Sequence, residues 1–275
     1  LDGRIAFEGT FYNKTVEDLI LNLNPAPSTG LGGVSTNAAT LENKGIELGL
    51  TVIPVQSTNL NWTSSLLWWK NESNITELNV PASISGAFST SFGFAKIEEG
   101  VSPTTIFGFD GDGNEVIFGN YQPDFQMSLA NNINFFKNFD ASFMLHWNKG
   151  SELTNLSDLL SDGRGNTDDY YSSGTTRTVR PAGTARYVDD GSYIKLREAS
   201  LYYTVPREIL SEKMGNVFSR IKVGVSGTNL LMFTDYGGYD PEVSALGRSN
   251  IGRQVDITPY PSSRKILFNI KFDIN

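Results

Sequence analysis

The sequence predicts an all-β chain that folds as part of a transmembrane antiparallel β-barrel. Eight segments alternate apolar and polar residues with period 2, which places the two kinds of side chain on opposite faces of a strand. The connections between these segments alternate between long and short. Outer-membrane barrels have this pattern, because their periplasmic turns are short and their extracellular loops are long. A compact soluble domain rarely holds four such long connections.

The composition of the 275-residue chain excludes several classes of protein. Hydrophobic residues make up 39% and aromatic residues 12%, and no apolar run is long enough for a transmembrane helix. The net charge of −8 argues against a nucleic-acid partner. The absence of cysteine excludes disulfides and thiolate sites. Because Leu1 is followed directly by a strand pattern, without an initiator Met or a signal peptide, we expect residues 1–275 to be a portion of a larger protein.

The predicted elements follow one another along the whole chain. Two short turns, at 54–58 and 137–138, and a moderate connection at 206–219 join strands at one end of the sheet. Asn138 suits a hairpin turn because Asn tolerates a positive φ, and the moderate connection has room for one helical turn. The long connections are 14–40, 76–122, 149–192 and 232–262. The expected strands are 3–13, 44–53, 59–75, 124–136, 139–148, 193–205, 220–231 and 263–275.

The last strand has the clearest alternation. Its apolar face carries Ile266, Phe268, Ile270, Phe272 and Ile274, whereas Lys and Asn dominate the other face. By itself this pattern fits either the closing strand of a barrel or the edge of a soluble sandwich. The alternation of loop lengths favours the barrel, so we expect the apolar faces to meet lipid and the small polar residues to line a lumen. Expected lipid-facing residues are Leu48, Leu129, Phe143, Val223 and Ile270, with Trp62, Trp68, Trp147, Tyr203 and Phe272 nearer the strand ends, where aromatic girdles lie.

Several runs resemble motifs of the SusC/RagA-type TonB-dependent transporters. The most specific are YVDDGSYIKLRE at 187–198, LYYTVP at 201–206 and TDYGGYDPEV at 234–243. Further matches are GTNLL at 227–231 and YPSSR at 260–264, and upstream ENKGIEL at 42–48 and FGN at 118–120. The motifs span the chain in the order that the family has them.

The resemblance implies a barrel of about 22 strands with a plugged lumen, of which this chain supplies the last eight. The plug domain and the TonB box lie outside this sequence. The implied function is TonB-dependent import of an oligomeric nutrient, a glycan or a peptide, across the outer membrane of a Gram-negative bacterium. The implied partners are a SusD-like lipoprotein lid, TonB acting through the plug, and outer-membrane lipids. A siderophore-type TonB-dependent receptor and a soluble β-rich binding or adhesion module are the alternatives.

Candidate binding residues lie in the long connections. Aromatic rings beside polar groups could stack on and hydrogen-bond a sugar or peptide, or could serve only loop solubility and packing against a lid. Tyr236, Tyr239 and Asp240 form a loop motif that we expect to be structural, since Pro241 and two glycines indicate a fixed turn. The candidate substrate-binding residues are Asp168, Asp169, Tyr170, Tyr171 and Arg186.

Catalytic and metal sites are not expected. Asp110 to Asn114 resembles a calcium loop, but Glu115 and Tyr121 occupy the positions where that loop needs Gly and Glu. We interpret it as a Gly-rich loop tip. His146 is the single histidine, which we expect on the lumen wall. No catalytic triad or carboxylate pair stands out, so the chain is not predicted to be an enzyme or to hold a cofactor.

Overall fold

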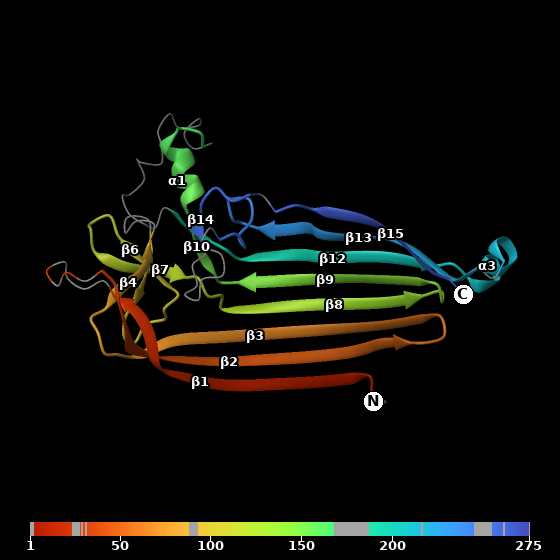
Figure 1. The fold of residues 1–275 in the computed structure, drawn as a ribbon, viewed down its shortest axis with the longest axis horizontal. Helices are drawn as coiled ribbons and strands as arrows, with labels where there is room; N and C mark the ends of the chain where they lie inside the picture. Colours follow the sequence, from red (N-terminus) through yellow and green to blue (C-terminus); the bar gives the residue numbers. More distant parts are fainter. Residues whose placement is uncertain are drawn as a thin grey trace.

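The computed structural model contains one large antiparallel sheet with two small sheets at one of its ends (Figure 1). It describes residues 3–23, 28, 30, 32–87, 93–167, 187–215, 217–244, 255–260 and 262–274. The long strands run side by side, and both termini lie at the end opposite the small sheets (Figure 1). No helix in the described part of the chain is long and apolar enough to cross a membrane.

The eight predicted strands form the large sheet, and each pairs with its neighbours in chain order. This confirms the predicted topology and differs from a sandwich of two large sheets. The strands are β1 (Ile5–Leu23), β2 (Val34–Gln56), β3 (Leu60–Leu78), β8 (Phe125–Phe135), β9 (Phe139–Lys149), β12 (Tyr193–Thr204), β13 (Phe218–Thr234) and β15 (Lys265–Ile274).

The first three strands are longer than the alternation predicts. Residues 14–23 and 34–40 were expected in a polar connection, yet they extend β1 and β2. Polar residues interrupt the apolar ones in both segments, but the two segments pair with each other over most of their length, and Ala38, Ala39 and Ile75 form a small core with Ile97 of the neighbouring sheet. Tertiary packing therefore outweighs local polarity here.

The long connections were also wrongly expected to lack structure. Residues 76–122 contain a four-stranded sheet, and 149–192 and 232–262 contribute to a three-stranded one. The elements are β4 (Ser83–Ala87), β5 (Phe94–Ile97), β6 (Thr105–Phe109), β7 (Glu115–Asn120), β10 (Glu152–Asn155), α1 (Leu156–Gly163), β11 (Val188–Asp190) and β14 (Val255–Asp256).

The short connections lie at the end opposite the small sheets. Between β8 and β9 the positive φ falls on Phe136 (51°) and Lys137 (64°), so the expectation for Asn138 was wrong. The neighbouring turn and strand bond to it: Phe136 donates its N–H to the carbonyl of Asn59 (2.8 Å), and Thr204, the last residue of β12, donates its N–H to the carbonyl of Asn138 (2.8 Å). The moderate connection holds α3 (Arg207–Met214), which is longer than the single turn predicted.

The outward face of the sheet is apolar over a height that fits a membrane. Registered partners in an antiparallel pair lie on one face, and one such row crosses seven strands. An aromatic cluster lies on each side of this row. In the upper cluster, toward the small sheets, Phe125 packs on Trp147 (5.1 Å between ring centroids), and in the lower cluster, toward the short turns, Phe135 packs on Phe139 (5.2 Å). Phe125 and Phe135 are separated by about 33 Å of strand, or about 25 Å of height at a tilt of ~40°. The row is Phe7, Leu50, Leu66, Leu129, Leu145, Leu196 and Leu231.

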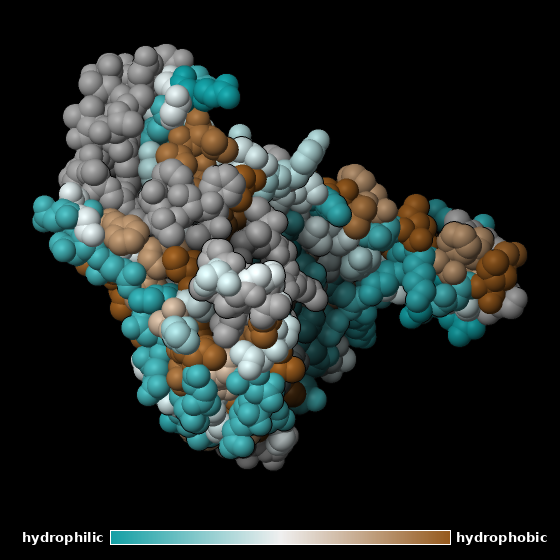
Figure 2. All heavy atoms as spheres, turned by 60° about the vertical axis from the view of Figure 1, so that its left-hand side comes forward, coloured by the Kyte–Doolittle hydropathy of each residue, from teal (hydrophilic) through white to brown (hydrophobic). Residues whose placement is uncertain are grey.

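The opposite face carries small polar side chains. Ser142 and Ser200 share a hydrogen bond of 2.8 Å, and Thr51 and Ser65 one of 3.0 Å. His146 also lies on this face, with Nδ1 3.0 Å from the hydroxyl of Ser128. Figure 2, turned toward the end with the small sheets, shows hydrophilic side chains over much of that end, with hydrophobic patches among them. The two faces of the sheet therefore differ in polarity as the sequence predicts.

Candidate functional site

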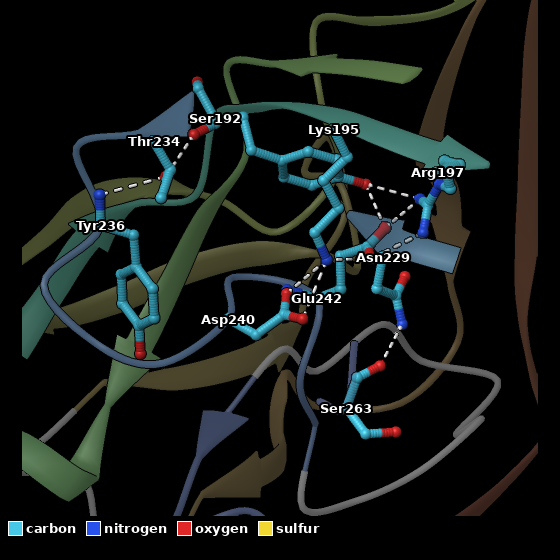
Figure 3. A network of polar contacts seen from close by, with 10 residues as sticks. Ser192, Lys195, Arg197, Asn229, Thr234, Tyr236, Asp240, Glu242 and Ser263 are labelled. Carbon is cyan, nitrogen blue, oxygen red and sulfur yellow. Dashed lines mark hydrogen bonds and ion pairs between the residues drawn. The ribbon is translucent and has the colours of Figure 1, made fainter. Parts of the chain in front are cut away.

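The end of β12 nearest the small sheets presents three functional side chains on the polar face. Tyr193, Lys195 and Arg197 occupy this segment, which belongs to the YVDDGSYIKLRE motif. A β-bulge at Arg197 gives β12 one residue more than β9 between the same register pairs, and β13 in turn has one residue more than β12 there. A bulge re-aims a side chain, and here Arg197 points to the same carboxylate as Lys195 (Figure 3).

The segment 235–244 after β13 folds back over these side chains. Its turn is closed by Asp240, whose carboxylate accepts the backbone N–H of Glu242 (3.0 Å) and whose carbonyl accepts that of Val243 (3.2 Å). An Asp that bonds the backbone two residues ahead forms a tight Asx turn. The turn therefore presents Asp240 and Glu242 together toward β12.

Buried ion pairs join the turn to the strand, as Figure 3 shows. Lys195 Nζ lies 2.7 and 2.9 Å from the two carboxylate oxygens of Asp240 and 2.5 Å from Glu242 Oε2. Arg197 Nη1 donates to Glu242 Oε2 at 2.8 Å, its Nη2 pairs with Oε1, and the Tyr193 hydroxyl donates to Oε1. The side chains of Lys195 and Asp240 are only 5% and 4% exposed. We call Tyr193, Lys195, Arg197, Asp240 and Glu242 the ion-pair cluster.

The electrostatics of the ion-pair cluster favour ionised Glu242. Burial alone raises the pKa of the Glu242 carboxyl, but hydrogen bonds from Arg197, Lys195 and Tyr193 outweigh it and lower the pKa to about 2. His146 lies beside the ion-pair cluster, with its ring centroid 5.8 Å from that of Tyr193. Paired charges in this setting fix geometry, because breaking one pair leaves a buried charge uncompensated.

A second anchor holds the same segment at Tyr236. The Tyr236 hydroxyl donates to Asp256 of β14 at 2.5 Å, and its backbone N–H donates to Thr234 Oγ1 at 3.1 Å. Burial, and then the Asp256 carboxylate, raise the pKa of Tyr236. A side chain at Gly238 would collide with the Tyr236 ring, which explains the glycine in this motif.

The predicted site residues therefore differ in their surroundings. Tyr236 and Asp240 are buried and hydrogen-bonded, whereas Tyr239 is 68% exposed, and the structural role of this loop motif stays a prediction. The candidate residues Asp168, Asp169, Tyr170, Tyr171 and Arg186 lie outside the described residues.

Sequence reasoning did not single out Lys195, Arg197 or Glu242. All three stand in the motif runs, but β13 separates the two motifs in the sequence. Only the folded structure shows that the three side chains meet. The available signal was two cations, Lys195 and Arg197, at positions i and i+2 of one strand.

The Asp110 loop between β6 and β7 is closed by its own side chain. Asp110 Oδ1 accepts the backbone N–H groups of Asp112 (2.9 Å) and Asn114 (2.8 Å). Within the described ranges, no group of three or more His, Cys, Asp or Glu is placed to hold a metal ion.

Comparisons with known proteins agree on one family, although no family model matches the chain. TonB-dependent receptors P26 and P3 of Formosa agariphila are 27% and 28% identical to it over 98% of its length. The chain spans 33% of each relative. These named relatives are receptors rather than enzymes.

Solved structures show the same fold. The RagAB peptide importer in its closed-closed state matches 98% of this chain and 34% of its own, with a TM-score of 0.74 and 18% identity. The open-open state matches with a TM-score of 0.74 and 17% identity. The chain is thus a relative of TonB-dependent receptors, as its resemblance to SusC/RagA-type transporters predicts, and it corresponds to about one third of such a receptor.

Proposed function

We propose that the chain is a C-terminal wall segment of a barrel that imports an oligomeric nutrient across the outer membrane. The observation that carries this proposal is the ion-pair cluster, which fastens the segment 235–244 over the polar face of the large sheet. A polar wall with a fixed loop at one mouth suits the passage of a hydrophilic solute.

The names of the related proteins are the basis for the energy source and the lid that we propose. The relatives are TonB-dependent receptors, and the similar RagAB structures are of a peptide importer. We therefore propose that TonB drives transport through a plug domain and that a SusD-like lipoprotein covers the long connections, 149–192 above all. The substrate is a peptide or a glycan, and Asp168, Asp169, Tyr170, Tyr171 and Arg186 remain the proposed contacts.

The test is uptake by cells that carry the full-length protein with its neighbouring lipoprotein. Deletion of the protein, of TonB or of the lipoprotein should each abolish growth on the peptide or glycan mixture as sole nutrient. Growth that is unaffected by deletion of the protein would contradict the proposal. Loss of growth under iron limitation alone would instead favour the siderophore-type alternative.

A soluble binding or adhesion module is the second alternative. It predicts that the full-length protein stays in the aqueous fraction when membranes are sedimented and washed at high pH. The apolar outward row, in which Phe7 is 68% exposed and Leu231 49% exposed, supports the membrane location instead.

A further inference from the structure

Two glutamates on the polar face of the large sheet have no cation beside them. Glu47 of β2 lies in register with Thr10 of β1 and with Trp69 of β3. Glu8 lies two residues from Thr10 along β1, which places it diagonally opposite Glu47, about 7–8 Å away. Both glutamate side chains point to the polar face and are exposed, and neither forms an ion pair within the described residues. Like charges that face each other on a sheet destabilise it, so a cation between them would be stabilising.

The cations of the same face do not compensate these glutamates. The lysine and the arginine of the ion-pair cluster lie on β12 and are already paired with its two carboxylates. On β1 the nearest cations of this face are Arg4, four residues from Glu8, and Lys14, four residues from Thr10. Four residues of strand correspond to about 13 Å. The two glutamates therefore leave uncompensated negative charge on this part of the wall.

An aromatic row begins beside Glu47. Trp69 packs on His146 of β9 with ring centroids 5.7 Å apart, and His146 packs on Tyr193 of β12 at 5.8 Å. Because Tyr193 belongs to the ion-pair cluster, the row is fixed at one end, and it presents the half-buried Trp69 ring at the other. The face of an indole ring attracts ammonium and guanidinium groups. Trp69 therefore suits the same kind of ligand as the glutamates.

A buried amide farther along the register adds an acceptor without a donor. Asn148 of β9 is in register with Gln126 of β8, which is in register with Trp69. Since Trp147 points outward, Asn148 points to the polar face. Asn148 is 3% exposed, and its Oδ1 has no hydrogen-bond partner within the part of the chain that the structure describes. A buried oxygen of this kind requires a donor, and an ammonium or guanidinium group only donates.

We propose that this part of the wall binds lysine or arginine side chains of an imported peptide. One cationic side chain lies between Glu8 and Glu47 beside the Trp69 ring, and a further donor of the same peptide bonds Asn148 Oδ1. A neutral glycan would leave both carboxylate charges uncompensated while displacing their water. The inference rests on the proposed function and narrows its substrate to a basic peptide.

The experiment measures peptide binding to the full-length protein with its lipoprotein, purified in detergent. The probe is a fluorescent seven-residue peptide of alanine and glycine with two lysines, and its matched form has both lysines acetylated. Wild type should bind the lysine form about tenfold more tightly, equivalent to about 1.4 kcal/mol. Glu8→Gln combined with Glu47→Gln should remove this preference. The control, Glu208→Gln with Glu212→Gln, removes the same charge from exposed α3 and should keep it.

A preference for the lysine form that is equal in wild type and in the variant of Glu8 and Glu47 would overturn the inference, provided that heat-modifiable gel mobility shows both to be folded. Its absence from wild type would do the same. Loss of affinity for a neutral malto-oligosaccharide in that variant, with the lysine peptide unaffected, would assign the wall to a glycan and also overturn it. Failure of the proposed function is a different result, because deletion of the protein would then leave growth on every peptide and glycan mixture unchanged.

Discussion

Lys195 is the residue on which the fixed position of the segment 235–244 depends most. It is buried and bonds two carboxylates, so its removal leaves Asp240 without its cation inside the protein. Breaking a buried pair in this way typically costs about 3–5 kcal/mol. We therefore expect Lys195→Met in the full-length protein to free the segment for protease cleavage, whereas Lys213→Met on exposed α3 should change nothing.

A compensating change tests whether charge rather than shape is responsible. Adding Asp240→Asn to Lys195→Met removes the buried carboxylate that has lost its cation, and the double variant should regain part of the protease resistance. An intact segment in Lys195→Met itself would show that the ion-pair cluster does not hold the loop.

Acid should release the same segment through Glu242. Its pKa is about 2 when folded and 4.5 ordinarily, so the folded state binds fewer protons between these values. A carboxyl with a lowered pKa contributes stability that is present above pH 4.5 and is lost as the pH falls toward 2. Protease sensitivity of the segment should therefore rise over this window, and Glu242→Gln should already be sensitive at neutral pH and nearly flat in its response.

At the scale of the element, β15 tests which face meets lipid. Phe272 is 57% exposed on the apolar face and packs edge-on against Phe218, while Lys271 lies opposite Lys222 on the polar face. An acidic group on the lipid face destabilises a barrel by about 1–3 kcal/mol, depending on depth. Phe272→Asp should reduce the folded, heat-modifiable form in outer-membrane fractions, and Lys271→Asn should leave it unchanged. Equal folding of the two variants would mean that the faces are reversed.

The strands also show which parts of the fold can be read from sequence. Where one face is apolar, as in β8, β9 and β15, the period-2 pattern predicts the strands within two residues. It misses the upper halves of β1 and β2, because residues such as Glu42 and Asn43 are polar on both faces and are held by backbone pairing and by bonds to other strands, such as the one that Ser73 donates to Asn43 (2.6 Å). It also misses the bulge at Arg197, which exchanges the inward and outward positions of β12 and depends on the neighbouring strands.

For the whole molecule, the placement of connections was predictable, whereas their content was not. The alternation of lengths gives the end at which each connection lies, but the small sheets arise from pairs such as Thr154 with Val255, which are about a hundred residues apart. The ion-pair cluster has the same origin, since its two motifs meet only after β12 and β13 have paired.

Cysteine labelling tests the membrane position of the whole sheet. Single cysteines at Leu48, Leu129, Phe143, Val223 and Ile270 of the full-length protein should resist a water-soluble maleimide in intact outer membranes and react after unfolding. A cysteine at exposed Tyr239, beyond the upper aromatic cluster, should react in both states. Rapid labelling at the first set in intact membranes would contradict a lipid-facing row.

The turn between β8 and β9 has a consequence for the order in which the sheet assembles. Phe136 and Lys137 adopt left-handed backbone conformations, each about 1–2 kcal/mol less favourable than for glycine, and the turn is held by bonds with Asn59 of the β2–β3 turn and with Thr204 at the end of β12. This short hairpin should therefore not be the first to form, and its closure should follow the pairing of β3 and β12 with β8 and β9. Lys137→Gly should remove this delay, so that pulse-labelled chains reach the heat-modifiable form sooner than wild type.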